Sequence, residues 1–361
     1  MTIDRLVLKE TKYPESLDWS LVEKWAHGIP VYRENDPNKP EWKPTPVIEA
    51  DFSSDGYGNI SIKNEADTSS NPTGTIKDRA AWELVTLFRD YARALILKKK
   101  SIDGSIELER IPRLSLISAG NVANSVSRMF HIYGLPPVKV LVDLTMPANR
   151  IETLKNMYAD VYLTDLSERR LNANDIKLLT NNTRGVDITS VRSIEPHAIF
   201  YDWHAHECFN ANPNEIYVPY GSGRLLENLL TWQQRTLRGY IEDKRDPRLR
   251  NSVQNVVSMS VLGSEPIDIN SGADKLTKKF NLNIFDDHDI GALEMFSFTG
   301  KNSGIYKVNE EKIIQAYELM QRHCNTEPSG AAGFALYLQR FEDGLIDSSK
   351  KILVVNTGKG I

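Results

Sequence analysis

The chain has 361 residues, of which 40% are hydrophobic and 25% charged, and its net charge of -4 corresponds to a pI near 6.0. This composition is typical of a soluble globular protein large enough for two lobes. The mild acidity provides no positive field that would gather nucleic acid or an anionic membrane, so we expect neither as a partner.

The cysteine usage and the hydropathy favour the cytoplasm. Cys208 and Cys324 lie far apart and form no CxxC pair, which fits a reducing compartment better than a disulfide framework. Residues 1–10 mix charged and aliphatic side chains and lack the apolar core of a signal peptide. No run is long and apolar enough to span a bilayer.

Apolar runs with the spacing of strands alternate with runs of helical spacing. In chain order we expect a helix over 80–93, a strand over 114–117, a helix over 125–133, a strand over 138–142, a helix over 150–158, strands over 159–163 and 216–219, a helix over 225–236 and a strand over 351–355. This alternation predicts an α/β fold with mostly parallel sheets.

One lysine follows a tight turn and opens the first of these helices. The segment reads Asn71-Pro72-Thr73-Gly74-Thr75-Ile76-Lys77-Asp78-Arg79. An amine held in a partly dry site can lose its charge and attack a carbonyl to form a Schiff base. Taken alone, the segment is equally compatible with an ordinary turn that carries a solvated lysine.

A glycine turn, Gly221-Ser222-Gly223, joins the strand 216–219 to the helix that follows it. Glycines at such a place let consecutive N–H groups point into one concavity, and the helix dipole adds positive potential, so a phosphate fits there. The turn is neither a P-loop nor a dinucleotide motif, because no Gly-Lys-Ser/Thr follows and GxGxxG is absent. An ordinary tight connection is the alternative.

Three further segments follow a strand or open a helix. Asn121 offers an amide after the strand 114–117, where the following N–H groups could receive a carboxylate, although a helix cap explains it equally well. Small residues over 328–333 permit close approach of a backbone or a flat ligand; the alternative is a helix start at which Glu327 and Ser329 satisfy free N–H groups. Thr357 offers a hydroxyl to a heterocycle nitrogen, or lies in a simple terminal turn. Open parallel sheets bind ligands beyond the carboxyl ends of their strands, so we expect one shared site.

In their order and approximate spacing these segments resemble the tryptophan-synthase-β-like superfamily of pyridoxal-phosphate enzymes, known as fold type II. The resemblance runs from about Thr45 to the last residue and includes 63–65 and 147–161. It implies two open, twisted, mostly parallel sheets flanked by helices, with pyridoxal 5'-phosphate in a cleft between the lobes. The large lobe is expected to be 1–93 with 171–361, the smaller and mobile lobe 94–170, and the assembly a homodimer.

The resemblance also implies the contacts of the cofactor. Lys77 is expected to form the Schiff base and then to act as general base and acid at the substrate Cα. Asn121 is expected to hydrogen-bond the ring hydroxyl. Thr357 matches the position whose hydroxyl meets the pyridine nitrogen, with Ser329 as the alternative. The N–H groups expected to hold the phosphate are those of Gly221, Ser222, Gly223 and Leu225.

On the substrate side, Ser118 and the N–H groups of Val122 and Ala123 resemble the receiver of the substrate carboxylate. Thr75 stands where relatives mostly have serine and keeps a hydroxyl. Arg224 replaces a usual glycine and either contacts a phosphate or points to solvent.

The expected substrate is a small amino acid that reacts at Cβ or Cγ. The motifs look most like threonine synthase, which converts O-phosphohomoserine to threonine and phosphate. The alternatives are a serine/threonine dehydratase (ammonia-lyase), a cysteine-synthase-like β-replacement enzyme and a catalytically silent relative. No metal is expected, because His204, His206 and Cys208 cannot all face one direction on a helix or strand.

Overall fold

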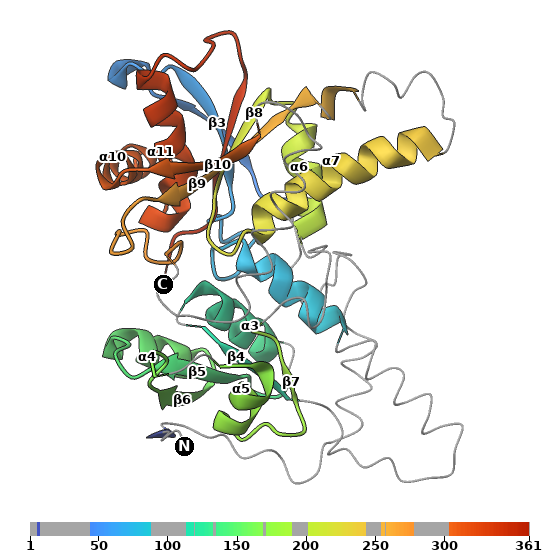
Figure 1. The fold of residues 1–361 in the computed structure, drawn as a ribbon, viewed down its shortest axis with the longest axis vertical. Coiled ribbons are helices and arrows are strands. Elements are labelled where there is room, and N and C mark those ends of the chain that lie inside the picture. The colour runs from blue at the N-terminus through green and yellow to red at the C-terminus, as the bar shows by residue number, and fades with distance from the viewer. Residues whose placement is uncertain are drawn as a thin grey trace.

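The computed structural model describes residues 6–7, 44–87, 113–118, 120–132, 135–168, 171–189, 201–242, 254–256, 258–277 and 303–360. These residues form two α/β lobes, shown one above the other in Figure 1, each built on its own sheet. The expectation of two mostly parallel sheets flanked by helices is confirmed. In the described part of the chain no helix is long and apolar enough to cross a membrane.

The large-lobe sheet has six strands among the described residues. Their spatial order is β10 (Gly304–Val308), β9 (Ser260–Pro266), β8 (Glu215–Pro219), β11 (Ile352–Asn356), β3 (Asn59–Asn64) and β2 (Val47–Asp51). Only the edge strand β2 runs antiparallel to its neighbour. All five residues of β8 and of β11 are buried, as expected of a parallel sheet covered on both faces.

The small-lobe sheet has five strands among the described residues. Their order is β1 (Leu6–Val7), β6 (Asp160–Thr164), β5 (Lys139–Asp143), β4 (Leu114–Ile117) and β7 (Val186–Asp187). Because β7 pairs with β4 and β1 pairs with β6, this sheet extends beyond the expected lobe of 94–170 at both ends. The strands 114–117, 138–142 and 159–163 expected from sequence correspond to β4, β5 and β6.

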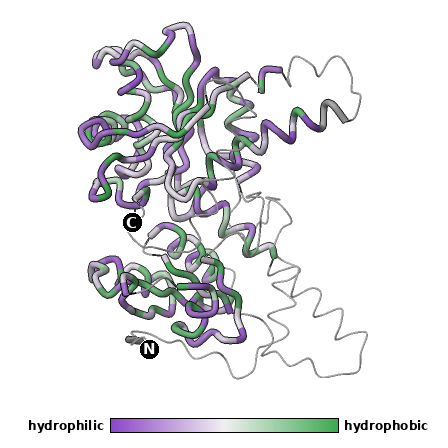
Figure 2. Tube along the Cα trace, viewed as in Figure 1, coloured by the Kyte–Doolittle hydropathy of each residue, from purple (hydrophilic) through white to green (hydrophobic). Residues whose placement is uncertain are grey.

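Helices cover both sheets. In the small lobe they are α3 (Asn121–Ile132), α4 (Ala148–Asn156) and α5 (Ala173–Leu179); in the large lobe they are η1 (Ser53–Asp55), α6 (Asp202–Asn210), α7 (Arg224–Glu242), α10 (Glu310–Met320) and α11 (Pro328–Glu342). Hydrophobic and hydrophilic residues alternate along α7 (Figure 2), and its leucines 225, 226, 229 and 230 are buried. This pattern is that of a helix with one face on the sheet.

A helix over 77–87 connects the lobes. Ile76, just before it, belongs to the apolar cluster of the large lobe that contains β8 and α7 residues. Ala81, Trp82 and Val85 instead pack in the core of the small lobe with residues of β4 and α3. The apolar face of this helix therefore packs in the small lobe, although its residues fall within the segment 1–93 that is expected to belong to the large lobe.

The carboxyl ends of the parallel strands gather at one edge of each sheet. In the large lobe this edge carries the segment after β3, the glycine turn after β8, the loop after β9 and the Thr357 turn after β11. In the small lobe the residues before α3 follow the end of β4. The topology therefore brings the separate sequence motifs to neighbouring positions.

Candidate active site

The lysine segment is joined to the Thr357 turn. The N–H of Ile76 donates to the carbonyl of Thr357 at 3.0 Å, and Oγ1 of Thr75 donates to the same carbonyl at 3.2 Å. The N–H of Lys359 donates to the carbonyl of Gly74 at 3.0 Å, and Gly74 has a φ of +72°, which favours glycine. An amine and a hydroxyl from opposite ends of the sequence thus lie on adjacent turns.

The amine of Lys77 is half-buried. Its Nζ donates to Oη of Tyr201 at 3.1 Å. The next residue, Asp78, accepts hydrogen bonds from the N–H and Oγ1 of Thr73 at 2.8 and 2.6 Å. Burial raises the pKa of Asp78 despite these hydrogen bonds. Lys77 therefore lies at the start of a helix whose first turn is held by two contacts: Lys77 binds Tyr201, and Asp78 binds Thr73.

The glycine turn between β8 and α7 needs its glycines. A Cβ on Gly221 would lie 3.1 Å from the carbonyl oxygen of Lys275, and Gly223 has a φ of +79°. The described residues supply no acceptor to the N–H groups of Gly221, Ser222 and Gly223. Leu225 shares an apolar cluster with Ile76. The turn therefore offers consecutive donors at a helix start near the lysine, which suits a phosphate.

Asn121 lies at the start of α3 and reaches across to the large lobe. Its Nδ2 donates to Oε1 of Glu327 at 2.8 Å, and its Oδ1 accepts from Nζ of Lys275 at 3.1 Å. Lys275 and Glu327 also form an ion pair. The alternative in which Asn121 caps α3 has no support, because its side chain is used in these contacts.

The alternative in which Glu327 and Ser329 cap the start of α11 with their side chains does not match the contacts of Glu327. Glu327 is the N-cap residue but makes no side-chain cap hydrogen bond, since its carboxylate binds Asn121 and Lys275. Oγ of Ser329 accepts from the N–H of Lys275 at 3.3 Å. Close approach by the small residues is confirmed: a Cβ on Gly330 would lie 2.7 Å from the carbonyl oxygen of Gly358.

Ser118 lies between β4 and α3, just before the residues that open α3. Its Oγ accepts from the N–H groups of Gly120 and Ala123, both at 3.3 Å. Val122, which is half-buried, and Ala123, which is buried, follow Asn121 in the first turn of α3. The residues expected to receive a carboxylate are therefore gathered at one helix start.

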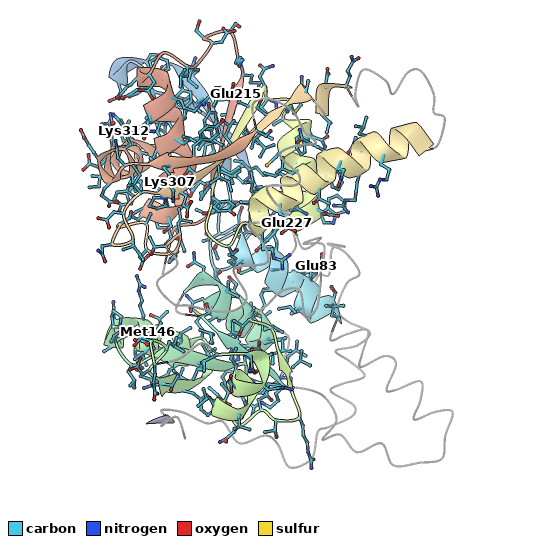
Figure 3. The ribbon with its side chains drawn as sticks, in the orientation of Figure 1. Glu83, Met146, Glu215, Glu227, Lys307 and Lys312 are labelled. Carbon is cyan, nitrogen blue, oxygen red and sulfur yellow. The ribbon has the colours of Figure 1, made fainter. Side chains whose placement is uncertain are left out.

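Arg224 does not point to solvent. It is 4% exposed, and its Nη1 lies 3.5 Å from Oε2 of Glu227 one turn further along α7. Figure 3 shows Glu227 in the first turn of that helix, at the lower end of the large lobe. Its guanidinium is therefore enclosed at the start of α7.

Two more contacts cross between the lobes. Oγ1 of Thr73 and Oγ of Ser125 lie 3.0 Å apart, and Nη2 of Arg150 on α4 lies 3.1 Å from Oδ2 of Asp274. Asp274 immediately precedes Lys275, so the loop after β9 contacts the small lobe with two consecutive side chains.

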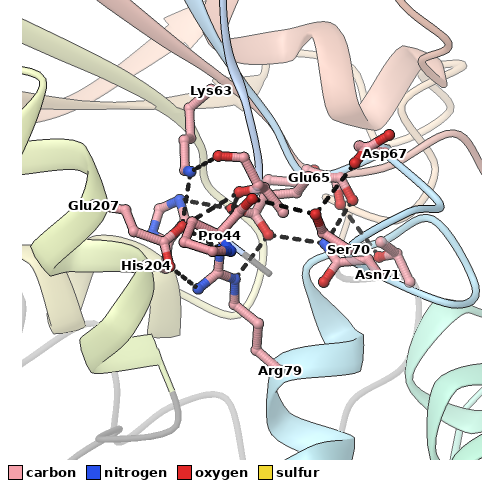
Figure 4. Close-up of polar contacts among 12 residues, drawn as sticks. Pro44, Lys63, Glu65, Asp67, Ser70, Asn71, Arg79, His204 and Glu207 are labelled. Atoms are coloured by element: carbon pink, nitrogen blue, oxygen red, sulfur yellow. Dashed lines mark hydrogen bonds and ion pairs between the residues drawn. The ribbon is translucent and has the colours of Figure 1, made fainter. Parts of the chain in front are cut away.

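A buried ionic cluster surrounds the guanidinium of Arg79, which belongs to the lysine helix (Figure 4). Arg79 binds both carboxylate oxygens of Glu65 at 2.8 and 2.9 Å and both of Glu207 at 3.1 and 2.7 Å. Nζ of Lys63 donates to Glu207 at 2.7 Å. Two cations thus meet two carboxylates, so the cluster compensates its own charge.

The cluster shifts the ionisation of its members. Burial raises the pKa of Glu65, but the charge of Arg79, together with His204, Lys63 and the hydrogen bonds from Arg79, outweighs burial and holds that pKa at about 2. Burial likewise opposes ionisation of Glu207, and the hydrogen bonds and charge of Arg79 lower its pKa below the usual range. Burial lowers the pKa of His204 to about 3, so this imidazole is neutral at pH 7.

The histidines of α6 do not form a metal site. His204 lies 3.4 Å from Sγ of Cys208, one turn further on, whereas His206 contacts Asn210 on another face of the helix. Burial raises the pKa of the Cys208 thiol. Within the part of the chain that the structure describes, no group of three or more His, Cys, Asp or Glu side chains could hold a metal ion.

With this geometry in view, comparisons with known proteins identify the family. Residues 39–358 match the family model described as pyridoxal-phosphate dependent enzyme, so the chain belongs to this family, and its cofactor is pyridoxal 5'-phosphate. The resemblance to fold type II enzymes is thereby confirmed. No curated protein sequence matched the chain.

Solved structures with the same fold are distant in sequence. The processed form of threonine deaminase isoform 2 from Solanum lycopersicum is 16% identical, with a TM-score of 0.60 over 99% of this chain and 96% of that one. Maize serine racemase is 16% identical (TM-score 0.57, 95% and 94% covered), and diaminopropionate ammonia lyase from Escherichia coli is 14% identical (TM-score 0.58, 99% and 94% covered). These likenesses establish the fold.

The residues of the site fit the cofactor. The glycine turn offers partnerless N–H donors for its phosphate, and Lys77, which follows Ile76 of the same apolar cluster as Leu225, offers an amine. Asn121 could hold the ring hydroxyl, and Thr357 could face the ring nitrogen. Sequence reasoning missed Tyr201 and Lys275, which contact Lys77 and Asn121 respectively. No local motif marks either residue, because each contact joins segments more than 100 positions apart.

Proposed function

We propose that this enzyme catalyses elimination at Cβ of a small amino acid, as a serine/threonine dehydratase or ammonia-lyase does. The observation that carries the proposal is the hydrogen-bonded pairing of the Lys77 segment with the Thr357 turn. This pairing supports a site in which Lys77, as the base, and the neutral hydroxyl of Thr357 both face the pyridine ring of the cofactor. The structural likeness to a threonine deaminase and an ammonia lyase agrees with it.

The roles follow from the chemistry of the side chains. The bound cofactor supplies an electron sink at the substrate Cα. Lys77 takes the Cα proton. Ser118 and the N–H groups of Val122 and Ala123 hold the substrate carboxylate, and the N–H of Ala123 exchanges its hydrogen bond to Oγ of Ser118 for one to the carboxylate. The hydroxyl of Thr357, unlike a carboxylate, does not force protonation of the ring nitrogen, so electrons remain available to expel a group from Cβ.

A threonine-synthase-like reaction on O-phosphohomoserine is the second candidate. The observation that favours it is the ammonium of Lys275, which lies beside Asn121 and is 21% exposed. Lys275 is more exposed than Arg224, which is 4% exposed, so this ammonium can hold a substrate phosphate by exchanging its ion pair with Glu327. The two candidates differ in their products: ammonia and a 2-oxo acid in one case, inorganic phosphate and threonine in the other.

A product screen on the cofactor-loaded enzyme tests the proposal. Serine, threonine, 2,3-diaminopropionate and O-phosphohomoserine are supplied in turn, and ammonia, 2-oxo acid, phosphate and the D-enantiomer are measured. We expect one ammonia per 2-oxo acid from serine or threonine, or two ammonia per 2-oxo acid from 2,3-diaminopropionate. Phosphate release with threonine formation would favour the second candidate, and racemisation without ammonia would contradict both.

Lys77→Ala is the matched variant for this screen. Because Lys77 makes one hydrogen bond and is only half-buried, its loss should leave the unfolding midpoint close to that of the parent. Turnover should fall by about 10³-fold or more, since both the attachment point and the base are removed. Full turnover by this variant would show that another group is the base.

A further inference from the structure

Tyr201 contacts the amine on which the reaction depends. Its side chain is 5% exposed, and its Oη accepts a hydrogen bond from Nζ of Lys77 at 3.1 Å. The same Nζ lies 5.4 Å from the centre of the phenol ring. Within the described residues, this hydroxyl is the one hydrogen-bond partner of the lysine amine.

The scaffold fixes this contact. Tyr201 immediately precedes α6, and Glu207 on the same helix binds Arg79, two residues beyond Lys77. Two contacts, Tyr201 with Lys77 and Glu207 with Arg79, therefore join α6 to the lysine helix; Figure 4 shows the second. Moving one helix against the other would break a buried ion pair and leave an enclosed charge without its partner, which is strongly unfavourable.

A phenol can both accept and donate a hydrogen bond, so it can pass a proton between two groups. We propose that Tyr201 is a second catalytic residue that relays a proton from Lys77 to the leaving group on the substrate Cβ. This inference rests on the proposed elimination. It adds a general acid, which an elimination needs when the leaving group is hydroxide or an amine.

The proton balance of the relay is closed. Lys77 takes the proton from Cα, and its ammonium passes one proton to Oη while the phenol gives its own proton to the leaving group. The bond from Cβ to the leaving group breaks, its electrons depart with that group, and a Cα–Cβ double bond forms. Tyr201 ends the step as a neutral phenol and Lys77 as a neutral amine.

Tyr201→Phe tests the relay, because it removes Oη and keeps the ring that packs in the apolar cluster with Ile76 and Leu225. With serine as substrate we expect kcat to fall by about 10- to 100-fold with little change in KM. With β-chloroalanine, whose chloride leaves without a proton, the loss should be less than about threefold. Equal losses on the two substrates would show a structural role and would overturn the inference.

Tyr337→Phe is the matched control. Tyr337 is also a buried phenol, 3% exposed, and its Oη donates to the carbonyl of Tyr57 at 2.9 Å, away from Lys77. This variant should lose stability without changing the ratio of rates on serine and β-chloroalanine. A change in that ratio as large as that of Tyr201→Phe would contradict the assignment.

Borohydride reduction separates this inference from the proposed function. Reduction of the cofactor-loaded parent and of Tyr201→Phe should add the mass of the cofactor at Lys77 in both. Absence of that mass in the parent would refute the proposed function itself. Labelling in both proteins, with unchanged turnover of serine by the variant, would refute only the role of Tyr201.

Discussion

Two ionic clusters flank the lysine segment, and they differ in burial and in what they join. Arg79 and Glu65 are fully enclosed, and every charge of their cluster meets an opposite charge. Lys275 and Glu327 keep 21% and 11% of their side-chain surface exposed, and with Asn121 they join the two lobes. The first cluster is a fixed part of the scaffold, whereas the second can exchange partners when a ligand arrives.

The largest expected effect comes from breaking the enclosed cluster with Arg79→Met. The variant removes the guanidinium that both Glu65 and Glu207 bind and keeps the Lys63–Glu207 ion pair, so we expect a loss of about 3–5 kcal/mol in the free energy of unfolding. Urea denaturation of the purified protein measures it.

Arg322→Met is the control for that variant, because Arg322 also binds both oxygens of a carboxylate, Asp55, at 3.0 Å but is 57% exposed. An exposed pair of this kind contributes less than about 1 kcal/mol. Similar losses from the two arginine variants would show that burial does not set the difference between the clusters.

The sequence predicted much of the fold and the segments of the site, because both leave local signals. The apolar runs at 114–117, 216–219 and 351–355 became strands, and Lys77, Asn121 and the glycine turn lie at the edges where parallel strands end. The enclosed cluster could not be predicted in this way. Arg79 and Glu207 are 128 positions apart, and no local spacing records that they meet.

Glu327 shows why local rules also misassign residues. Its position before a helix and a proline predicts a capping side chain, and its backbone is the N-cap. Asn121 and Lys275 come from other segments and bind the carboxylate instead of the helix N–H groups. The ammonium of Lys275 is a charged donor and makes a stronger hydrogen bond than a neutral N–H can. Tertiary contacts therefore decide the role of this side chain.

Acid should destabilise the protein through His204 and Glu65, two titratable side chains buried beside Arg79. The pKa of His204 falls from 6.5 to about 3 on folding, so below pH 6.5 the unfolded chain binds more protons and stability decreases as the pH falls. Between pH 6.5 and pH 5, about 1.5 units, we expect a loss of about 2 kcal/mol. The lowered pKa of Glu65, from 4.5 to about 2, has the same sign and adds a further loss below about pH 4.5.

Urea unfolding at several pH values, compared with His204→Gln, measures the histidine contribution. The variant has no imidazole to titrate, so its stability should change less between pH 6.5 and pH 5 than that of the parent. Identical slopes for the two proteins would assign the acid sensitivity to other groups.

The smallest effect on stability is expected from Lys275→Met, which removes the ion pair with Glu327 and the hydrogen bond to Asn121. Because Lys275 and Glu327 remain partly hydrated, the free energy of unfolding should fall by about 1 kcal/mol or less. The affinity for pyridoxal phosphate should fall by about fivefold, since Asn121 loses the ammonium that orients its amide. Lys312→Met, which breaks the Lys312–Glu342 ion pair elsewhere in the large lobe, should leave that affinity unchanged. A loss of stability by Lys275→Met as large as that of Arg79→Met would show that both clusters belong to the fixed scaffold.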